Sequence, residues 1–408
     1  MKPRGAWACI AIWILGGIAA MAAVKTGGDM LAEGGFQLLK GKRVGLITNP
    51  SGVNSRRQST IDLLRRAPNV KLVALFAAEH GLRGTLPAGT EFPNAQDPRT
   101  SLPVYSLYGP GPTRKPTPAM LRNIDTLVYD VQDTGCRSYT FISTMGLAME
   151  ACGENGKEFM VLDRPNPLGG LRVEGPLLDP RFRSFVGQWE IPYVYGMTCG
   201  ELAHMIKGER WISKPCRLTI VRMAGWKRSM AWRDTDLAWV PTSPNIPRGD
   251  SPLYYTSVGV LGSVGGVNIG IGQNRPFEFV AATWLDDQKL SRHLNGRVNL
   301  DQVRFSPFTI SYRNELNKGV RLVFKDPARA PLLALNFHLM EAIRATSGRD
   351  LYQEARRAGK DFGILDKVAG TETVQRALKE KWPANQLVKS WQAGEEAFRQ
   401  RRQKYLLY

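Results

Sequence analysis

The stretch Val70-Lys-Leu-Val-Ala-Leu-Phe-Ala-Ala-Glu-His-Gly-Leu-Arg-Gly84 joins a largely apolar run to a polar turn. Residues 70–76 are rich in β-branched and aliphatic side chains, which predicts a buried strand. Loops that leave the carboxyl ends of parallel strands line the ligand crevice of an open sheet, so Glu79 and His80 should reach a cleft. A carboxyl group there suits general acid chemistry, because a dry environment favours its protonated form. An acidic helix cap or turn is the alternative interpretation.

Strand and helix patterns alternate on both sides of this stretch. Buried-strand patterns occur at residues 43–48, 126–130, 159–163 and 217–221. Helical spacing occurs at 59–66, at 145–152, and after a capping box at 198–201. This alternation predicts an α/β domain with a doubly wound parallel sheet. Residues 84–118 are rich in proline and glycine and are expected to form a long ordered loop that acts as a lid or binding element.

The second half of the chain follows a different pattern, beginning near the prolines of residues 241–247. A glycine-rich stretch at 258–272 precedes two predicted strands, 303–312 and 319–324, with Asn-Lys-Gly turn chemistry between them. A helix is expected over 332–345, and another from Leu387 to the end. We therefore expect an α/β domain over 24–245 and a smaller α+β domain over 246–408. No G-x-G-x-x-G opens a helix after a strand, so no nucleotide cofactor is predicted.

The chain is basic, with 55 Lys and Arg against 36 Asp and Glu and a formal net charge of +19. Such a balance favours anionic partners, including acidic cell-wall polymers. The arginines are scattered rather than gathered in one block. The sequence has no helix-turn-helix, zinc-finger or RNP motif, so nucleic acid is not an expected partner and a solvated basic surface is the simpler interpretation.

The first 23 residues resemble a signal peptide. Lys2 and Arg4 precede an apolar run, and Ala20-Met-Ala22 offers small residues at cleavage spacing. We expect export to the periplasm or outside the cell; an uncleaved N-terminal membrane anchor is the alternative, because the run is nearly long enough to cross a bilayer. Four cysteines remain after cleavage, with no C-x-x-C pair, so either disulfides or buried thiols fit them.

The chemistry-bearing residues gather at three predicted strand ends. The first set is Glu79 and His80. The second lies in residues 129–139 and comprises Asp130, Gln132, Asp133, Arg137 and Tyr139. The third follows residue 162 and comprises Asp163, Arg164, Asn166 and, further on, Glu174. Each residue alone has a structural interpretation; Arg137, for example, would pair with Asp130. Together, carboxylates, amides and aromatic rings suit a sugar, whose hydroxyls need donors and acceptors and whose faces stack on rings.

Several motifs in this order resemble a known family. They are E-H-G at 79–81, Y-D-x-Q-D-x-G-x-R-x-Y-T at 129–140, D-R-P-N-P-L-G-G at 163–170 with V-E-G-P at 173–176, and G-M-T-x-G-E-L-A at 196–203. The set is similar to the bacterial exo-β-N-acetylmuramidases of the NamZ type, glycoside hydrolase family 171, from about Gly35 to Tyr408. No single motif would be specific.

The resemblance implies a Rossmann-like N-terminal domain, a C-terminal auxiliary domain and an active site between them. It implies release of terminal N-acetylmuramic acid from peptidoglycan fragments without any cofactor or nucleotide, with Glu79 as the catalytic acid. His80 would tune Glu79, and Asp130 or Asp133 would activate water unless the substrate's acetamido group attacks instead. Further substrate-binding residues are expected in both halves: Gln132, Arg137, Tyr139, Asp163, Arg164, Asn166, Glu174, Tyr195, Asn245, Arg275 and Glu278.

This chain departs from the family pattern at two places. Tyr195 stands where the family has histidine, and Ile269 and Ile271 stand where it has an acid and an arginine. We therefore expect either a changed sugar preference or a loss of activity.

Two other function classes remain open. A metal-dependent hydrolase would use the carboxylates and His80 as ligands; a non-catalytic cell-wall binding protein would use the same cleft without hydrolysis.

Overall fold

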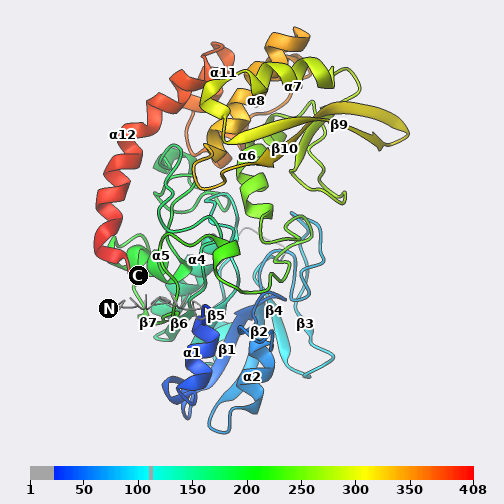
Figure 1. Ribbon diagram of the computed structural model, residues 1–408. Helices are drawn as coiled ribbons and strands as arrows, with labels where there is room; N and C mark the ends of the chain where they lie inside the picture. Colours follow the sequence, from blue (N-terminus) through cyan, green and yellow to red (C-terminus); the bar gives the residue numbers. More distant parts are fainter. Residues whose placement is uncertain (1–22, 110–113) are drawn as a thin grey trace, which may run out of the picture.

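A computed structural model describes residues 23–109 and 114–408 of the protein. Its lower half in Figure 1 is built on one sheet of seven strands in the order β3-β4-β2-β1-β5-β6-β7. Neighbouring strands are parallel except for β3, which pairs antiparallel with β4 at the edge. The strands are β1 (Arg43–Thr48), β2 (Lys71–Ala77), β3 (Ala95–Gln96), β4 (Pro103–Ser106), β5 (Thr126–Asp130), β6 (Glu158–Leu162) and β7 (Arg217–Val221).

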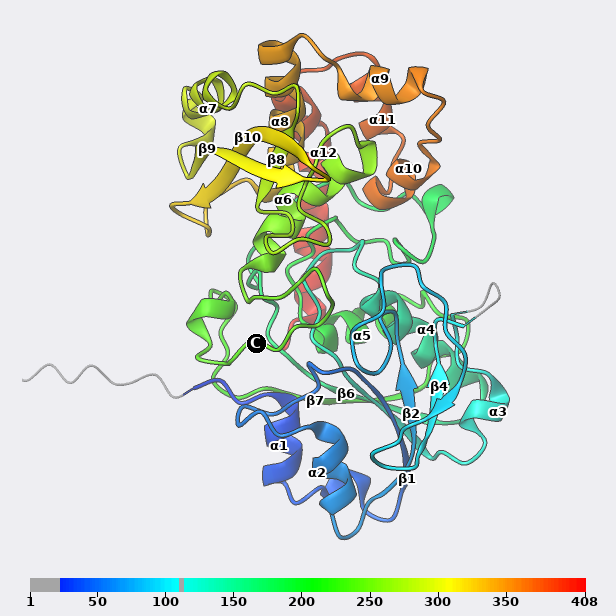
Figure 2. The same ribbon diagram turned by 90° about the vertical axis from the view of Figure 1, so that its right-hand side faces the viewer.

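Helices cover both faces of this sheet (Figure 2). Side chains alternate along the strands, so Leu46 of β1 and Leu75 of β2 pack on the side of α1 and α2, in the core that also holds Leu64. Their neighbours Ile47 and Phe76 lie in the core of α4 and α5. The helices of this half are α1 (Gly27–Glu33), α2 (Thr60–Arg66), α3 (Pro118–Leu121), α4 (Phe141–Glu154) and α5 (Cys199–Gly208). The doubly wound fold predicted from the sequence is confirmed.

The strand order reverses direction at β1, so the topological switch point lies between β1 and β5. Ligands of doubly wound sheets bind outside the carboxyl ends of the strands at this point. The segments that follow β1, β2, β5 and β6 therefore meet at one edge, which faces the second half of the molecule (Figure 1).

The second half combines helices with a small antiparallel sheet of order β8-β10-β9, as the predicted α+β class requires. Its strands are β8 (Phe279–Ala282), β9 (Val303–Tyr312) and β10 (Glu315–Phe324). Its helices are α6 (Ser251–Val264), α7 (Asp287–Asn295), α8 (Leu332–Ser347), α9 (Leu351–Arg357), α10 (Gly363–Ala369), α11 (Thr373–Lys379) and α12 (Ala384–Arg402). One apolar core runs from α4 and α5 into these helices, so the two halves share buried surface.

Three local predictions need correction. The Asn-Lys-Gly turn is wrong: residues 317–319 lie inside β10, and the hairpin turns at Arg313 and Asn314, whose φ angles are 52° and 63°. Two consecutive positive φ angles define the type I′ turn, which matches strand twist. The glycine-rich stretch at 258–272 begins within α6, which the sequence analysis did not predict. The expected loop at 84–118 contains the short strands β3 and β4.

The last helix returns to the first half of the chain. α12 descends along the molecule and the C-terminus lies beside α5 and β7 (Figure 1). Arg402 donates to the carbonyl oxygens of Tyr195 and Gly196, and the Tyr408 hydroxyl donates to Asp163 Oδ2 at 2.8 Å. The terminal residues thereby bind the segments that follow β6 in the N-terminal half.

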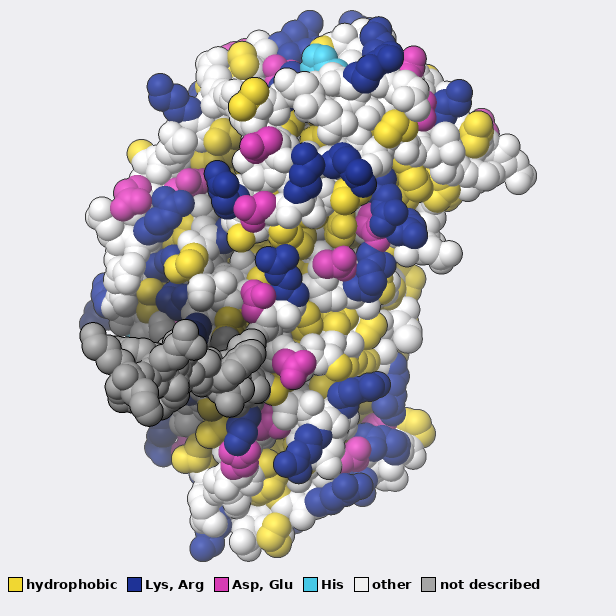
Figure 3. Space-filling model, viewed as in Figure 1, with side chains coloured by type: hydrophobic (Ala, Val, Ile, Leu, Met, Phe, Trp, Pro, Cys, Tyr) yellow, Lys and Arg dark blue, Asp and Glu magenta, His cyan; other side chains and the backbone are white. Residues whose placement is uncertain are grey.

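Lysine and arginine side chains are spread over the face shown in Figure 3 rather than gathered in one block. Among the described residues, no helix is long and apolar enough to cross a membrane. The predicted signal peptide, residues 1–23, lies outside the described residues except for Ala23. Four cysteines in the described part are buried and unpaired: Cys136, Cys152, Cys199 and Cys216.

Candidate active site

Glu79 lies two residues beyond β2, at the carboxyl edge of the sheet. Its residue is 8% exposed, and both carboxyl oxygens accept hydrogen bonds. The backbone N–H of Gly89 donates to Oε1 at 2.8 Å, and the Thr140 hydroxyl donates to Oε2 at 2.5 Å. Within the described part of the chain, no lysine or arginine forms an ion pair with it. Glu79 is therefore sheltered and oriented, as the sequence analysis expected.

His80 belongs to the turn that orients the Glu79 side chain. Its φ of 70° is a left-handed conformation that costs energy for a residue with a side chain. The ring nitrogen Nδ1 lies 2.8 Å from the carbonyl oxygen of Leu86, and the ring packs edge-on against Phe141. These contacts fix His80 beside Glu79, which is a positioning role.

The segment between β2 and α3 brings Tyr108, two residues beyond β4, close to Glu79. Burial raises the pKa of the Tyr108 phenol to about 12, and the nearby Glu79 carboxylate adds to this shift. The Arg114 guanidinium lies 3.8 Å from the centroid of the Tyr108 ring and also faces Phe185. Arg114 and Glu91 form an ion pair of 3.1 Å. This loop, residues 82–109 together with 114–117, is called the lid below.

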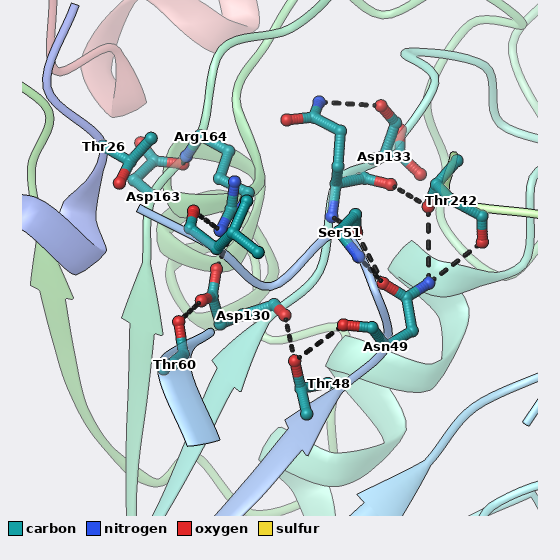
Figure 4. A network of polar contacts seen from close by, with 12 residues as sticks. Thr26, Thr48, Asn49, Ser51, Thr60, Asp130, Asp133, Asp163, Arg164 and Thr242 are labelled. Atoms are coloured by element: carbon teal, nitrogen blue, oxygen red, sulfur yellow. Dashed lines mark hydrogen bonds and ion pairs between the residues drawn. The ribbon is translucent and has the colours of Figure 1, made fainter. Parts of the chain in front are cut away.

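The switch point itself is filled by the protein's own side chains (Figure 4). Asn49 Nδ2 donates to the Thr242 carbonyl oxygen at 3.0 Å, and the Thr242 hydroxyl donates to the Gln132 carbonyl oxygen at 2.7 Å. The backbone N–H of Gln132 donates to Ser51 Oγ at 2.9 Å. A segment from the start of the second half therefore crosses the crevice in which nucleotide-binding members of this fold place their ligand.

Asp130 is not available to activate water, contrary to the expectation from the sequence. It is completely buried, and Arg164 Nε donates to Oδ1 at 2.5 Å while Thr60 donates to Oδ2. Its partner is thus Arg164 rather than Arg137. Arg164 also donates to the Val53 carbonyl oxygen and is 5% exposed, so it is a structural residue rather than a substrate ligand.

Asp133 keeps one carboxylate oxygen without a partner among the described residues. Tyr195 donates its hydroxyl to Oδ2 at 2.6 Å and the Gly135 N–H donates to the same oxygen, while Oδ1 is unpaired. Burial raises the pKa of Asp133 to about 6, with these hydrogen bonds opposing the shift. Gln132 Oε1 is also buried and unpaired, although Gln132 Nε2 donates to two carbonyl oxygens. Of the two aspartates after β5, Asp133 is the one with free acceptor capacity.

Four further residues that were predicted to bind substrate use their polar atoms in hydrogen bonds or ion pairs with other parts of the protein. The Arg137 guanidinium donates to the carbonyl oxygens of residues 176, 191, 368 and 369. Asp163 accepts from Thr198, Gly200 and Tyr408, and burial raises its pKa to about 6. Asn166 caps its own turn and donates to the Met197 carbonyl oxygen. Glu174 pairs with Arg172 and accepts from the Leu333 N–H of α8. These contacts correct the prediction for Arg137, Asp163 and Asn166, which join structural elements, whereas the Glu174 side chain keeps 19% of its surface exposed.

The residues predicted in the second half lie together near the start of α6. The Glu278 carboxylate is buried among three arginines, Arg248, Arg275 and Arg321. Asn245 Oδ1 accepts from the Gly272 N–H at 3.0 Å. Within that loop Ile269 is buried, whereas Ile271 is 53% exposed.

Tyr139 belongs to a group of aromatic rings that connects the two halves. Its ring packs edge-on against Phe141 at 4.8 Å and against Tyr255 at 5.9 Å, and Tyr255 packs on Phe277 at 5.2 Å. Because Thr140 lies between Tyr139 and Phe141 and donates to Glu79, the rings link the carboxyl site to the loop before Glu278.

Sequence reasoning missed Tyr108, Thr140, Thr242 and Arg248. Thr140 ends the motif at 129–140, so the motif itself contained a signal. Tyr108 and Thr242 approach the site only through long-range folding, and no local pattern marks them.

No group of three or more histidine, cysteine, aspartate or glutamate side chains in residues 23–109 and 114–408 is arranged to hold a metal ion. The predicted ligands Glu79, His80, Asp130, Asp133 and Asp163 are thus not assembled into one set. The metal-dependent alternative lacks the geometry that it requires.

A Rossmann-like sheet with a sheltered glutamate at its carboxyl edge, joined to an α+β half that contributes a segment to its switch point, defines the class of fold. Family comparison places the chain more closely: it belongs to the exo-β-N-acetylmuramidase NamZ family. Its residues 44–250 match the NamZ N-terminal model and residues 253–408 match the C-terminal model.

Individual relatives agree with this assignment. The chain is 41% identical over 397 residues to the peptidoglycan β-N-acetylmuramidase NamZ of Bacillus subtilis (strain 168), covering 94% of this chain and 91% of the relative. Two crystal structures of DUF1343 family proteins from Bacteroides fragilis NCTC 9343 share the fold. One is 46% identical with a TM-score of 0.87, covering 95% of this chain and 99% of the other. The second is 28% identical with a TM-score of 0.75, covering 94% and 99%.

Proposed function

We propose that this protein is an exo-acting glycoside hydrolase that releases terminal N-acetylmuramic acid, or a related amino sugar, from peptidoglycan fragments. Family membership over both halves and the named activity of the Bacillus subtilis relative support the reaction class. The observation that carries the mechanism is the position of Glu79, sheltered at the sheet edge and held by Gly89 and Thr140 without a cationic partner in the described chain.

Glu79 acts as the general acid. Its carboxyl group donates a proton to the glycosidic oxygen while the bond to the terminal sugar breaks. His80 and the lid keep the carboxyl group oriented and away from bulk water. For the second role, Asp133 has the acceptor capacity that Asp130 lacks, and the substrate's acetamido oxygen is the alternative nucleophile.

Replacement of Glu79 by Gln tests the acid. We expect Glu79→Gln to lower kcat by at least about 100-fold on a natural glycan fragment, because general acid catalysis contributes on that order. Glu33→Gln, at an exposed glutamate in an ion pair with Lys25, is the matched control and should retain wild-type activity. Release of muramic acid by Glu79→Gln at the wild-type rate would remove Glu79 from this role.

Replacement of Asp133 by Asn separates the two routes of attack. If Asp133 activates water, kcat should fall at least about 100-fold, and the acid limb of the wild-type pH profile should lie near pH 6. If the acetamido group attacks, activity should persist with Asp133→Asn and disappear on a substrate that lacks the acetamido group.

We also propose that the protein is exported, with cleavage after Ala22. The fold begins directly beyond this position: the Val24 N–H donates to the Thr235 carbonyl oxygen, and Lys25 pairs with Ala224. A retained anchor would therefore join the fold without a linker. N-terminal sequencing of the protein from cell fractions should yield Ala23 in the soluble exported fraction, whereas recovery of intact residues 1–22 in the membrane fraction would support the anchor.

A further inference from the structure

The antiparallel sheet of the second half carries a hollow of about 570 Å³ beside the hairpin end. It lies between the loop at 265–272, the residues that follow β8 and the turn between β9 and β10. This volume is within the range of about 300–1,000 Å³ that is typical of small-molecule sites. The hollow is separate from Glu79, which does not line it.

The floor of the hollow is apolar and aromatic. Ile271, Trp284 and Tyr312 line it, and Ile271 is 53% exposed, so its side chain is accessible to a ligand. The Arg349 guanidinium lies 4.1 Å from the centroid of the Trp284 ring and is held there by a bidentate ion pair with Glu354. Arg349 and the apolar core thus fix the orientation of Trp284, whose partly exposed ring borders the hollow.

Polar groups suited to hydroxyls and amides surround this floor. Asn268 and Asn317 line the hollow, and Asn268 Nδ2 is buried with no hydrogen-bond partner among the described residues. The charged side chains of the lining are Arg313 and Glu315, which balance each other. A neutral ligand with an apolar face and several hydroxyls fits this environment better than an anion.

The hollow is connected to the catalytic edge. The Gly272 N–H donates to Asn245, which lies in the segment that crosses the switch point. The other end of the same loop carries Phe277, whose ring contacts Tyr255 and through it the rings beside Thr140 and Glu79. A glycan bound with its terminal sugar near Glu79 would extend from this edge.

We propose that the hollow is an accessory subsite for an uncharged N-acetylated hexosamine unit of the glycan chain. The proposal rests on the proposed function, because it places this unit beyond the sugar that is released. Ile271 and the exposed part of the Trp284 ring contact the C–H face of the sugar, while Asn268 and Asn317 bind its hydroxyl or acetamido groups.

Kinetics on two substrates test the subsite. A nitrophenyl glycoside of N-acetylmuramic acid offers the terminal sugar alone, whereas a peptide-free peptidoglycan tetrasaccharide reaches further. For Trp284→Ala we expect KM for the tetrasaccharide to rise about tenfold, equivalent to the loss of one stacking contact, with kcat and the nitrophenyl glycoside unaffected. Trp382→Ala, at another half-buried tryptophan beneath an arginine, is the control and should leave both substrates unchanged.

Ile271→Asp provides a second test, because an exposed side chain can change without harm to folding. It should raise KM for the tetrasaccharide, whereas Ile364→Asp, at a residue that is 47% exposed and outside the hollow, should not. Unchanged tetrasaccharide KM in both Trp284→Ala and Ile271→Asp would overturn the proposal.

Binding separates this inference from the hydrolase proposal. Calorimetry with an N-acetylglucosamine trimer on Glu79→Gln should show binding that Trp284→Ala weakens about tenfold. If the wild type hydrolyses neither substrate but the trimer binds in this way, the reaction is wrong and the subsite holds. If the trimer fails to bind, or binds equally after Trp284→Ala, the subsite is wrong whatever the activity.

Discussion

The two aspartates after β5 show how neighbours decide the role of a carboxylate. Asp130 and Arg164 are both buried and form an ion pair, while Asp133 meets only a phenol and a backbone amide. A buried charged group without a partner carries an uncompensated desolvation cost, so Asp130 and Arg164 stabilise each other inside the protein. Sequence alone places both aspartates at the sheet edge but does not reveal which of them forms an ion pair with an arginine.

Replacing one member of the buried pair should destabilise the protein strongly. We expect Asp130→Asn to lower the free energy of unfolding by about 3–5 kcal/mol, because Arg164 is left buried without its counter-charge. Asp62→Asn, which breaks the more exposed pair with Arg99, is the control and should cost less than about 1 kcal/mol. Urea titration of both variants measures the difference; similar losses would contradict the buried-pair argument.

Glu395 of α12 predicts a pH dependence of stability. Burial raises its pKa to about 7, above its ordinary value, so the folded protein binds this proton more tightly than the unfolded chain. Its contribution to stability is therefore present below about pH 4.5 and is lost as the pH rises through about 7. Between pH 5 and 8 the free energy of unfolding of Glu395→Gln should therefore fall by about 1–3 kcal/mol less than that of the wild type. Urea unfolding at several pH values measures this difference.

The neighbouring residue supplies the comparison for that titration. Glu396 has a side chain that is 60% exposed, so Glu396→Gln should follow the wild-type pH profile. A profile for Glu395→Gln that equals the wild type would show that Glu395 does not titrate in this range.

At the scale of elements, the lid joins chain segments that no local pattern connects. The sequence predicts its proline-rich course, and the capping box at Thr198 correctly predicts the start of α5, because both depend on residues close in sequence. Tyr108 and Phe185, which pack on each other and both face Arg114, are far apart in sequence, and neither was predicted. The hairpin turn was missed for a different reason: Arg313-Asn314 lacks the glycine that usually marks such a turn.

Arg114→Ala should loosen the lid without unfolding the domain. We expect KM to rise about threefold to tenfold on a glycan substrate, because the cation–π contact with Tyr108 and the ion pair with Glu91 are both lost. The melting temperature should change by less than a few degrees, since about 1 kcal/mol or less is at stake for an exposed pair. Wild-type KM in Arg114→Ala would show that the lid closes without this contact. Arg376→Ala, beside Trp382, is the control.

At the scale of the whole molecule, the two halves should unfold together. The common apolar core and the contacts of α12 with the first half join them. The predicted boundary near residue 245 marks a change of pattern in the sequence, but sequence patterns could not show that the final residue returns to Asp163. That contact depends on the length and direction of the entire last helix.

Tyr408→Phe tests this long-range connection. The loss of one donor to the buried Asp163 should cost about 1–3 kcal/mol. Thermal unfolding should remain a single transition at a lower midpoint. Two separated transitions in the wild type would show that the halves are independent, and an unchanged midpoint in Tyr408→Phe would show that Asp163 does not depend on the terminal phenol.

The anchoring of Tyr408 also bears on biosynthesis. The strands of the large sheet lie before residue 222, whereas one of the three donors to the Asp163 side chain named above, the Tyr408 hydroxyl, is synthesised about 190 residues after β7. During synthesis the sheet can therefore form before this donor exists, and loss of residues 402–408 should remove the contacts of Arg402 and Tyr408 with the first half.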